Sequence, residues 1–127
     1  MPLLVRDVMT IGVPVCRETE IGGLVAARLA AQRPPAEVVV ALDEAGMACG
    51  WASAAALAGH PDQPVSAILD EDIPQVPPDI PAAAAAQMMR DRGVTHAFLM
   101  HAWPGEPRPS AMLALTAIIA RLEALPE

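Results

Sequence analysis

Two hydroxyl side chains, Ser53 and Thr116, each stand directly before a stretch of small and aliphatic residues that can form a helix. A hydroxyl in this position can cap the helix by accepting a hydrogen bond from a backbone amide of the first turn. It can also join the exposed amides of that turn in binding an anion such as a phosphate. The residue types alone leave both interpretations open.

Trp51 stands two residues before Ser53, where the sequence alternates like a strand. The chain contains two tryptophans, one phenylalanine and no tyrosine. An indole in this place can stack on a flat ring, or it can fill a core that is otherwise short of volume. Trp103 lies in a loop with three prolines, and we expect it to be exposed or to lie at a protein–protein contact.

No catalytic constellation is present: the sequence contains no nucleophile elbow, no P-loop and no acid/base pair with a histidine at helical spacing. We therefore expect no enzyme and no catalytic residue. The three histidines, His60, His96 and His101, do not have the spacing of a zinc site, so no metal is predicted. Cys16 and Cys49 fit no CxxC pattern and are interpreted as buried, reduced thiols.

The overall charge and hydropathy exclude two classes of partner. The formal net charge is −7, and no basic stripe is present, which argues against nucleic acid as a partner. The opening residues MPLLVRD do not resemble a secretory signal. The longest apolar runs, of about ten residues, are too short to cross a bilayer. We therefore expect no membrane partner and a cytoplasmic location.

The elements that must position these side chains occur twice, at an offset of 60 residues. The segment VRDVMTIGVP (Val5 to Pro14) aligns with VSAILDEDIP (Val65 to Pro74). The same offset places Thr19 on Asp79, and both residues are predicted to be helix N-caps. Helices are expected over residues 20–33, with an apolar stripe that includes Leu24, and over residues 80–93.

Each half continues with a strand, a hairpin, a returning strand and a short helix. The predicted ranges are 37–42, 43–46, 47–52 and 53–59 in the first half, and 96–101, 102–110, 110–115 and 116–125 in the second. About 60 residues bury too little surface to be stable alone. The halves, 1–62 and 63–127, are therefore predicted to pack sheet to sheet as one pseudo-twofold domain of α+β class (mixed α/β).

The opening motif RDVMT, the step from Val13 to Pro14 and this order of elements resemble a tandem pair of cystathionine-β-synthase (CBS) domains, a Bateman module. The resemblance covers about residues 3 to 123. It implies two βαββα repeats with a cleft between them that binds an adenosine-containing ligand such as AMP, ATP or S-adenosylmethionine. It also implies a regulatory role, a homodimer and a regulated protein partner.

The ligand signature of that family, Gly-hydrophobic-x-Ser/Thr-x-x-Asp, falls on Gly50, Trp51 and Ser53, with Ala56 at the aspartate position. In the second half Thr116 keeps the hydroxyl, but the glycine and aspartate positions carry Leu113 and Ile119. The candidate ligand-binding residues that the resemblance implies are Thr10, Val13, Pro14, Trp51, Ser53, Ile73, Pro74 and Thr116. For the residues around the two prolines, an ordinary turn into a strand is an equally good interpretation.

Two functions remain open at this stage. The first is a stand-alone sensor that binds an adenine nucleotide or a related phosphate-bearing ligand, whose identity the sequence does not give. Because Ala56 and Ile119 replace the carboxylates that would hold a ribose, a retained site is expected to favour a phosphate over a ribose diol. The alternative is a pair whose sites have decayed, and which forms a stable dimer or an interaction scaffold without any ligand.

Overall fold

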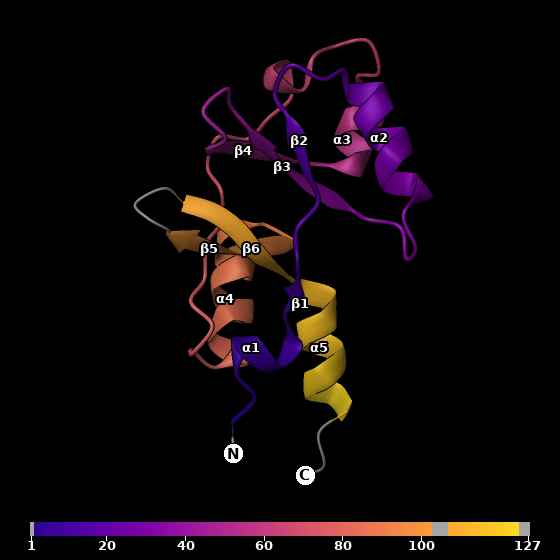
Figure 1. The fold of residues 1–127 in the computed structure, drawn as a ribbon. Helices are drawn as coiled ribbons and strands as arrows, with labels where there is room; N and C mark the ends of the chain where they lie inside the picture. Colours follow the sequence, from indigo (N-terminus) through magenta and orange to yellow (C-terminus); the bar gives the residue numbers. More distant parts are fainter. Residues whose placement is uncertain (1, 103–106, 125–127) are drawn as a thin grey trace. The chain divides into compact units, whose positions relative to one another are not determined.

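The computed structural model describes residues 2–102 and 107–124, which form two compact units (Figure 1). The α2 unit contains residues 13–73 together with residues 102 and 107–108, and the α4 unit contains residues 2–12, 74–101 and 109–124. Each unit holds a three-stranded sheet and the helices that pack on it. The predicted mixture of helices and sheets, an α+β fold, is confirmed.

The α2 unit contains the sheet β2-β3-β4, in which β2 and β3 are parallel and β3 and β4 are antiparallel. Its elements are β2 (Val15–Arg17), α2 (Gly22–Ala31), β3 (Val38–Leu42), β4 (Ala48–Ser53), α3 (Ala54–Gly59) and the short 3₁₀ helix η1 (Val65–Ala67). Helices α2 and α3 lie side by side (Figure 1). Three successive β-branched valines open β3 and favour the extended backbone.

The predicted hairpin between β3 and β4 is confirmed. The amide of Asp43 donates to the carbonyl of Met47 at 2.9 Å. The Asp43 carboxylate accepts from the amides of Ala45 and Met47 at 2.9 and 3.0 Å. Gly46 has φ +81°, a left-handed backbone that glycine adopts without strain. Local turn chemistry therefore sets this connection.

The α4 unit contains the sheet β1-β6-β5. Its elements are α1 (Val5–Val8), β1 (Thr10–Ile11), α4 (Ala82–Arg92), β5 (His96–Ala102), β6 (Pro107–Ala114) and α5 (Leu115–Ala124). Helix α4 ends at Gly93, whose φ of 69° and ψ of 30° form a left-handed cap. Trp103 lies outside the described residues.

Each unit has its own aliphatic core. In the α2 unit, Val25 and Leu29 of α2 pack with Val39 of β3 and Leu57 of α3. In the α4 unit, four residues of α4 at helical spacing meet the sheet: Ala82, Ala85, Ala86 and Met89. Small alanine side chains allow α4 to approach the sheet closely, which explains how a chain with so few aromatics builds a core. Leu24, placed on the apolar stripe of α2 by the sequence, is 70% exposed.

The offset of 60 residues is confirmed by matching backbone hydrogen bonds. The amide of Gly22 donates to the carbonyl of Gln63 at 2.8 Å, and the amide of Ala82 donates to that of Leu3 at 2.7 Å. A second matched pair links Val65 to Glu20 and Val5 to Ile80. The opening segment of each sequence repeat therefore packs on the long helix of the other repeat. The compact units cut across the repeats because these opening segments are exchanged.

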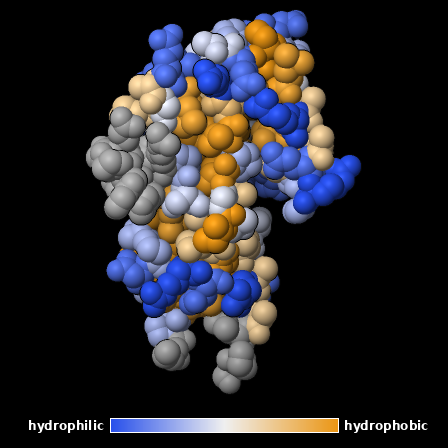
Figure 2. Space-filling view, viewed as in Figure 1, coloured by the Kyte–Doolittle hydropathy of each residue, from blue (hydrophilic) through white to orange (hydrophobic). Residues whose placement is uncertain are grey.

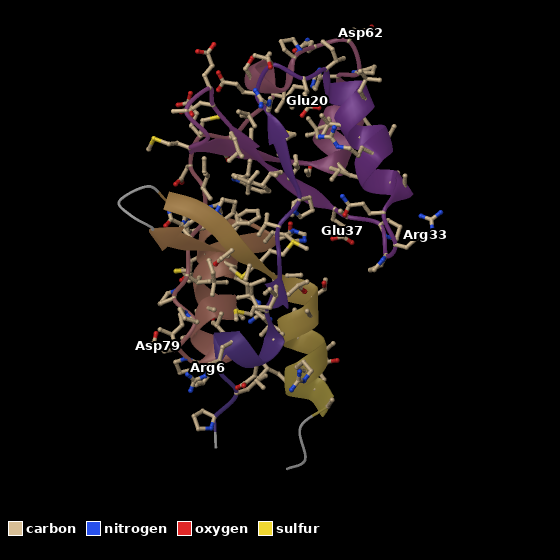
Figure 3. All side chains as sticks on the ribbon, viewed as in Figure 1. Arg6, Glu20, Arg33, Glu37, Asp62 and Asp79 are labelled. Atoms are coloured by element: carbon tan, nitrogen blue, oxygen red, sulfur yellow. The ribbon has the colours of Figure 1, made fainter. Side chains whose placement is uncertain are left out.

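The predicted N-caps Thr19 and Asp79 are wrong. Helix α2 begins at Gly22 and helix α4 at Ala82, with Ile21 and Pro81 at the two N-cap positions. Figure 3 shows Asp79 in the loop ahead of α4. Backbone carbonyls of the exchanged segments accept from the first amides of both helices, so no side-chain cap is needed. The sequence signal failed because the acceptor lies far away along the chain.

Candidate functional site

Trp51 and Ser53 project from the same face of β4. Their neighbour Ala52 lies opposite Val39 in the sheet, and both belong to the core under α2 and α3. Since successive residues of a strand point to opposite faces, Trp51 and Ser53 project from the face opposite to α2 and α3. Both side chains are partly exposed. The α2 unit therefore presents an indole and a hydroxyl two residues apart on one sheet face.

Ser53 is the N-cap of α3, as one of its two interpretations predicts. Its hydroxyl oxygen accepts from the amide of Ala56 at 3.1 Å, and the amide of Ala54 donates to the carbonyl of Glu37 at 2.8 Å. Two amides of the first turn therefore have partners within the chain. A hydroxyl that accepts one hydrogen bond can still donate another, so Ser53 can cap α3 and donate a hydrogen bond to another group at the same time.

Trp51 contacts the segment that leaves the α2 unit through both its backbone and its side chain. Its amide donates to the carbonyl of Asp70 at 3.0 Å, and its carbonyl accepts from the amide of Asp70 at 2.9 Å. The indole Nε1 donates to the carbonyl of Asp72 at 3.1 Å. The indole is therefore held at its nitrogen edge by this hydrogen bond. Sequence reasoning did not foresee this contact, because no local pattern links residues 51 and 72.

Gly50 has a structural reason to be glycine. A Cβ atom at this position would lie 2.9 Å from the carbonyl oxygen of Asp70 and 3.0 Å from the Cβ of Leu69. Those distances are shorter than carbon atoms normally tolerate. The glycine therefore admits the chain segment that crosses β4, and this packing accounts for it without any ligand.

A hollow of about 100 Å³ lies beside the hairpin of the α2 unit. It is lined by Arg17, Leu42, Asp43, Glu44 and Gly46. None of the candidate ligand-binding residues lines it. Within residues 2–102 and 107–124, no three His, Cys, Asp or Glu side chains come together in a way that could hold a metal ion. In the same part of the chain no helix is long and apolar enough to cross a membrane.

The fold is shared with solved structures of low sequence identity. The CBS-domain pair of protein MJ0100, solved with 5′-methylthioadenosine and S-adenosyl-L-methionine, has a TM-score of 0.80 at 15% identity, with 97% of each chain covered. The CBS-domain protein ATU1752 from Agrobacterium tumefaciens has a TM-score of 0.75 at 17% identity, with 94% of this chain and 93% of that chain covered.

A third structure is the cytosolic domain of the Mg²⁺ channel MgtE in complex with ATP. It has a TM-score of 0.72 at 21% identity, and the match covers 91% of this chain and 47% of that chain. No protein-family model and no curated protein matches the sequence. The chain has the fold of a CBS-domain pair.

The second sequence repeat does not present its hydroxyl where the first does. Helix α5 begins at Leu115, so Thr116 is its second residue, and the predicted role of Thr116 as N-cap is wrong. The amide of Leu115 donates to the carbonyl of Thr95 at 2.9 Å. This contact matches the one from Ala54 to Glu37 and makes Ala114 the counterpart of Ser53. The sequence alignment of the repeats placed three extra residues in the second hairpin and so matched Thr116 with Ser53. That number of extra residues was too large.

The strand pairing of the two units gives the same equivalence. Met112 lies opposite Thr10 in the β1–β6 ladder, as Trp51 lies opposite Asp70 in the other unit. Position 112 is therefore the counterpart of Trp51. A thioether replaces the indole and a methyl group replaces the hydroxyl, so only the α2 unit combines an aromatic ring with a hydroxyl at these positions.

The remaining candidate ligand-binding residues divide between the two units. Val13, Pro14 and Ile73 lie in the α2 unit, whereas Thr10 and Pro74 lie in the α4 unit. The carbonyls of Pro14 and Pro74 accept from the amides of Val40 and Phe98 at 3.0 and 2.8 Å. Hydrogen bonds of this kind are expected where a turn leads into a strand. Val40 is also the register partner of Trp51, so Pro14 and Trp51 flank one position of the sheet.

Two free thiols lie in the α2 unit, Cys16 buried and Cys49 half-buried. Burial raises the pKa of Cys16 to about 11. The thiol of Cys49 donates to the carboxylate of Glu18 at 3.1 Å. Burial, and then the hydrogen bond and charge of Glu18, raise the pKa of Cys49 to about 12. Both groups are thus protonated near neutral pH, which is unlike the lowered pKa of a reactive cysteine.

Proposed function

We propose that this CBS pair is a regulatory module whose α2 unit binds an adenine nucleotide or a related phosphate-bearing ligand. The observation that carries the proposal is the placement of Trp51 and Ser53 together on the face of β4 opposite to α2 and α3. An indole face can stack on a purine with a contribution of about 1 kcal/mol beyond the area it buries. The Ser53 hydroxyl can donate to a phosphate oxygen.

The solved relatives support this class of ligand. The pair in MJ0100 was solved with two adenosine derivatives, and the MgtE cytosolic domain with ATP. In this chain Ala56 stands where the family signature has an aspartate, and its side chain has no group that can bind a hydroxyl. We therefore propose that phosphate and purine, rather than the ribose diol, dominate recognition. AMP is the ligand to test first, with ATP and S-adenosylmethionine beside it.

Isothermal titration calorimetry with AMP, ATP, S-adenosylmethionine and adenosine tests the proposal. We expect a nucleotide to bind, adenosine to bind at least tenfold more weakly, and Trp51→Ala and Ser53→Ala each to weaken the nucleotide. Met112→Ala, at the counterpart position of the α4 unit, is the matched control and is expected to leave affinity unchanged. Absence of heat with every ligand of the panel would overturn the proposal.

A second candidate function, a dimerisation scaffold, is favoured by the surface of α2. Leu24 is 70% exposed and Ile21 is 38% exposed, and Figure 2 shows apolar residues gathered over this helix. Ala27 and Ala31 on the same helix are also exposed and let another helix approach closely. An exposed apolar face of this kind is typical of a contact surface, and a second copy of the chain would bury it.

Sedimentation velocity of the protein without added ligand tests the scaffold. We expect a dimer, and we expect Leu24→Glu to convert it to a monomer. Ile11 is 75% exposed but lies in β1, so Ile11→Glu adds the same charge away from α2 and serves as the control. A monomeric parent protein, or a dimer that survives Leu24→Glu, would rule this function out.

A further inference from the structure

The segment that leaves the α2 unit is attached to β4 by more than backbone pairing. Residues 70–73, which we call the linker, run to the boundary with the α4 unit, which resumes at Pro74. Trp51 and Asp70 exchange two backbone hydrogen bonds, and the Trp51 indole adds a third bond to the carbonyl of Asp72. A side chain of the candidate site thus reaches the connection between the units.

A local turn presents the carbonyl that the indole meets. The Asp70 carboxylate accepts from the amide of Asp72 at 2.9 Å, which folds residues 70–72 into a compact turn. Gly50 allows the preceding residues to lie directly on β4, because the carbonyl oxygen of Asp70 would be only 2.9 Å from a Cβ at that position. The turn and the close approach together bring the Asp72 carbonyl within reach of the indole nitrogen.

The connection between the units at residues 12–13 is held differently. Thr10 and Ile11 pair with Met112 and Ala111, and the amide of Gly12 donates to the carbonyl of Ser110 at 2.9 Å. At the counterpart of Trp51 stands Met112, whose thioether has no hydrogen to donate. The connection at residues 12–13 is therefore held through the backbone, whereas the linker is also held by a side chain.

We propose that the Trp51 indole transmits ligand binding to the linker by contacting both the ligand and the linker. We call this role the latch. The inference rests on the proposed function, because the ligand must stack on the same indole. The ring nitrogen donates a hydrogen bond to the carbonyl of Asp72, and this bond fixes the orientation of the indole. A purine that stacks on the ring face therefore binds the indole in its hydrogen-bonded orientation. A ligand that prefers one conformation increases its population, and the linker consequently becomes more ordered when the nucleotide binds.

Hydrogen exchange of the amides of the linker, followed by mass spectrometry, tests the latch. Without ligand, Trp51→Phe keeps an aromatic ring but removes the N–H, and we expect exchange in the linker to be about two- to tenfold faster. Asp70→Ala opens the turn and is expected to act in the same direction. Glu71→Ala lies in the same linker, and we expect parent-like exchange. Parent-like exchange in both Trp51→Phe and Asp70→Ala would overturn the latch.

The second part of the experiment adds AMP. Each variant receives AMP at a concentration that saturates it, as calculated from the Kd measured for that variant. In the parent protein AMP is expected to slow exchange in the linker, and in Trp51→Phe this slowing is expected to be lost. Equal slowing in both proteins would overturn the transmission through the indole. If AMP does not bind, the nucleotide of the calorimetric panel that does bind takes its place. A parent protein that binds no ligand of the panel would overturn the transmission together with the proposed function, and the comparison without ligand would still decide whether the indole holds the linker.

Discussion

Arg28 of α2 donates from both terminal nitrogens to the carboxylate of Glu20, at 2.8 and 3.1 Å. The same carboxylate accepts from the amide of Arg17 at 2.8 Å and so joins the end of β2 to the helix (Figure 3). The hydrogen bond from Arg28 is the main cause that lowers the pKa of Glu20 from 4.5 to about 2. This ion pair gives the α2 unit an acid-sensitive contact.

Glu20→Gln is expected to lower the free energy of unfolding by at most about 1 kcal/mol at pH 7, because the pair is largely exposed. A lowered folded-state pKa stabilises the fold fully above pH 4.5 and progressively less as the pH falls towards 2. The difference between parent and variant should therefore shrink over that window. Urea denaturation at pH 7, 4 and 2.5 measures it, with Glu44→Gln as an exposed control.

Ser53→Ala is expected to cost about 1 kcal/mol of unfolding free energy, since it removes the acceptor of the Ala56 amide. Thr116→Ala, inside the first turn of α5, is the matched control and is expected to change stability by less than about 0.5 kcal/mol. Thermal and chemical denaturation of both variants decide the point. Equal losses would mean that Thr116 also caps a helix, contrary to the observed start of α5.

Gly50→Ala is expected to destabilise the fold by about 1–3 kcal/mol, because the new methyl group meets the Asp70 carbonyl and Leu69. Gly59, the last residue of α3, has nothing within 4 Å of an added Cβ. Gly59→Ala is therefore expected to be neutral or stabilising by up to about 1 kcal/mol. Opposite signs in parallel urea titrations would confirm the close approach at Gly50, and a neutral Gly50→Ala would contradict it.

Alkylation of the thiols tests the contact between Cys49 and Glu18. At pH 8 both cysteines are expected to react slowly with iodoacetamide, since the raised pKa values leave little thiolate. Glu18→Gln removes the hydrogen-bonding charge, lowers the pKa of Cys49 and should speed its alkylation several-fold. Mass spectrometry resolves the two sites, so Cys16 serves as an internal control. An unchanged rate at Cys49 would exclude the influence of Glu18.

The elements and the repeat could be predicted because they depend on nearby residues. The hairpin forms because Asp43 and Gly46 are residues that favour a tight turn. The repeat offset of 60 residues is seen again in the matching backbone hydrogen bonds of Gly22 and Ala82. The helix starts were mispredicted at Thr19, Asp79 and Thr116, where carbonyls distant along the chain satisfy the first amides. A sequence window contains the capping side chain but not the distant carbonyl that makes it unnecessary.

The chemistry of the candidate site follows from the local sequence: an indole at 51 and a hydroxyl at 53 on alternating positions share a face of a strand wherever that strand lies. The other features of the site depend on tertiary contacts. Tertiary structure exchanged the opening segments between the repeats, placed the Asp72 carbonyl against the Trp51 indole and made Ala114, not Thr116, the counterpart of Ser53. Side-chain alternation follows from the local backbone, whereas these contacts depend on which distant segments pack together.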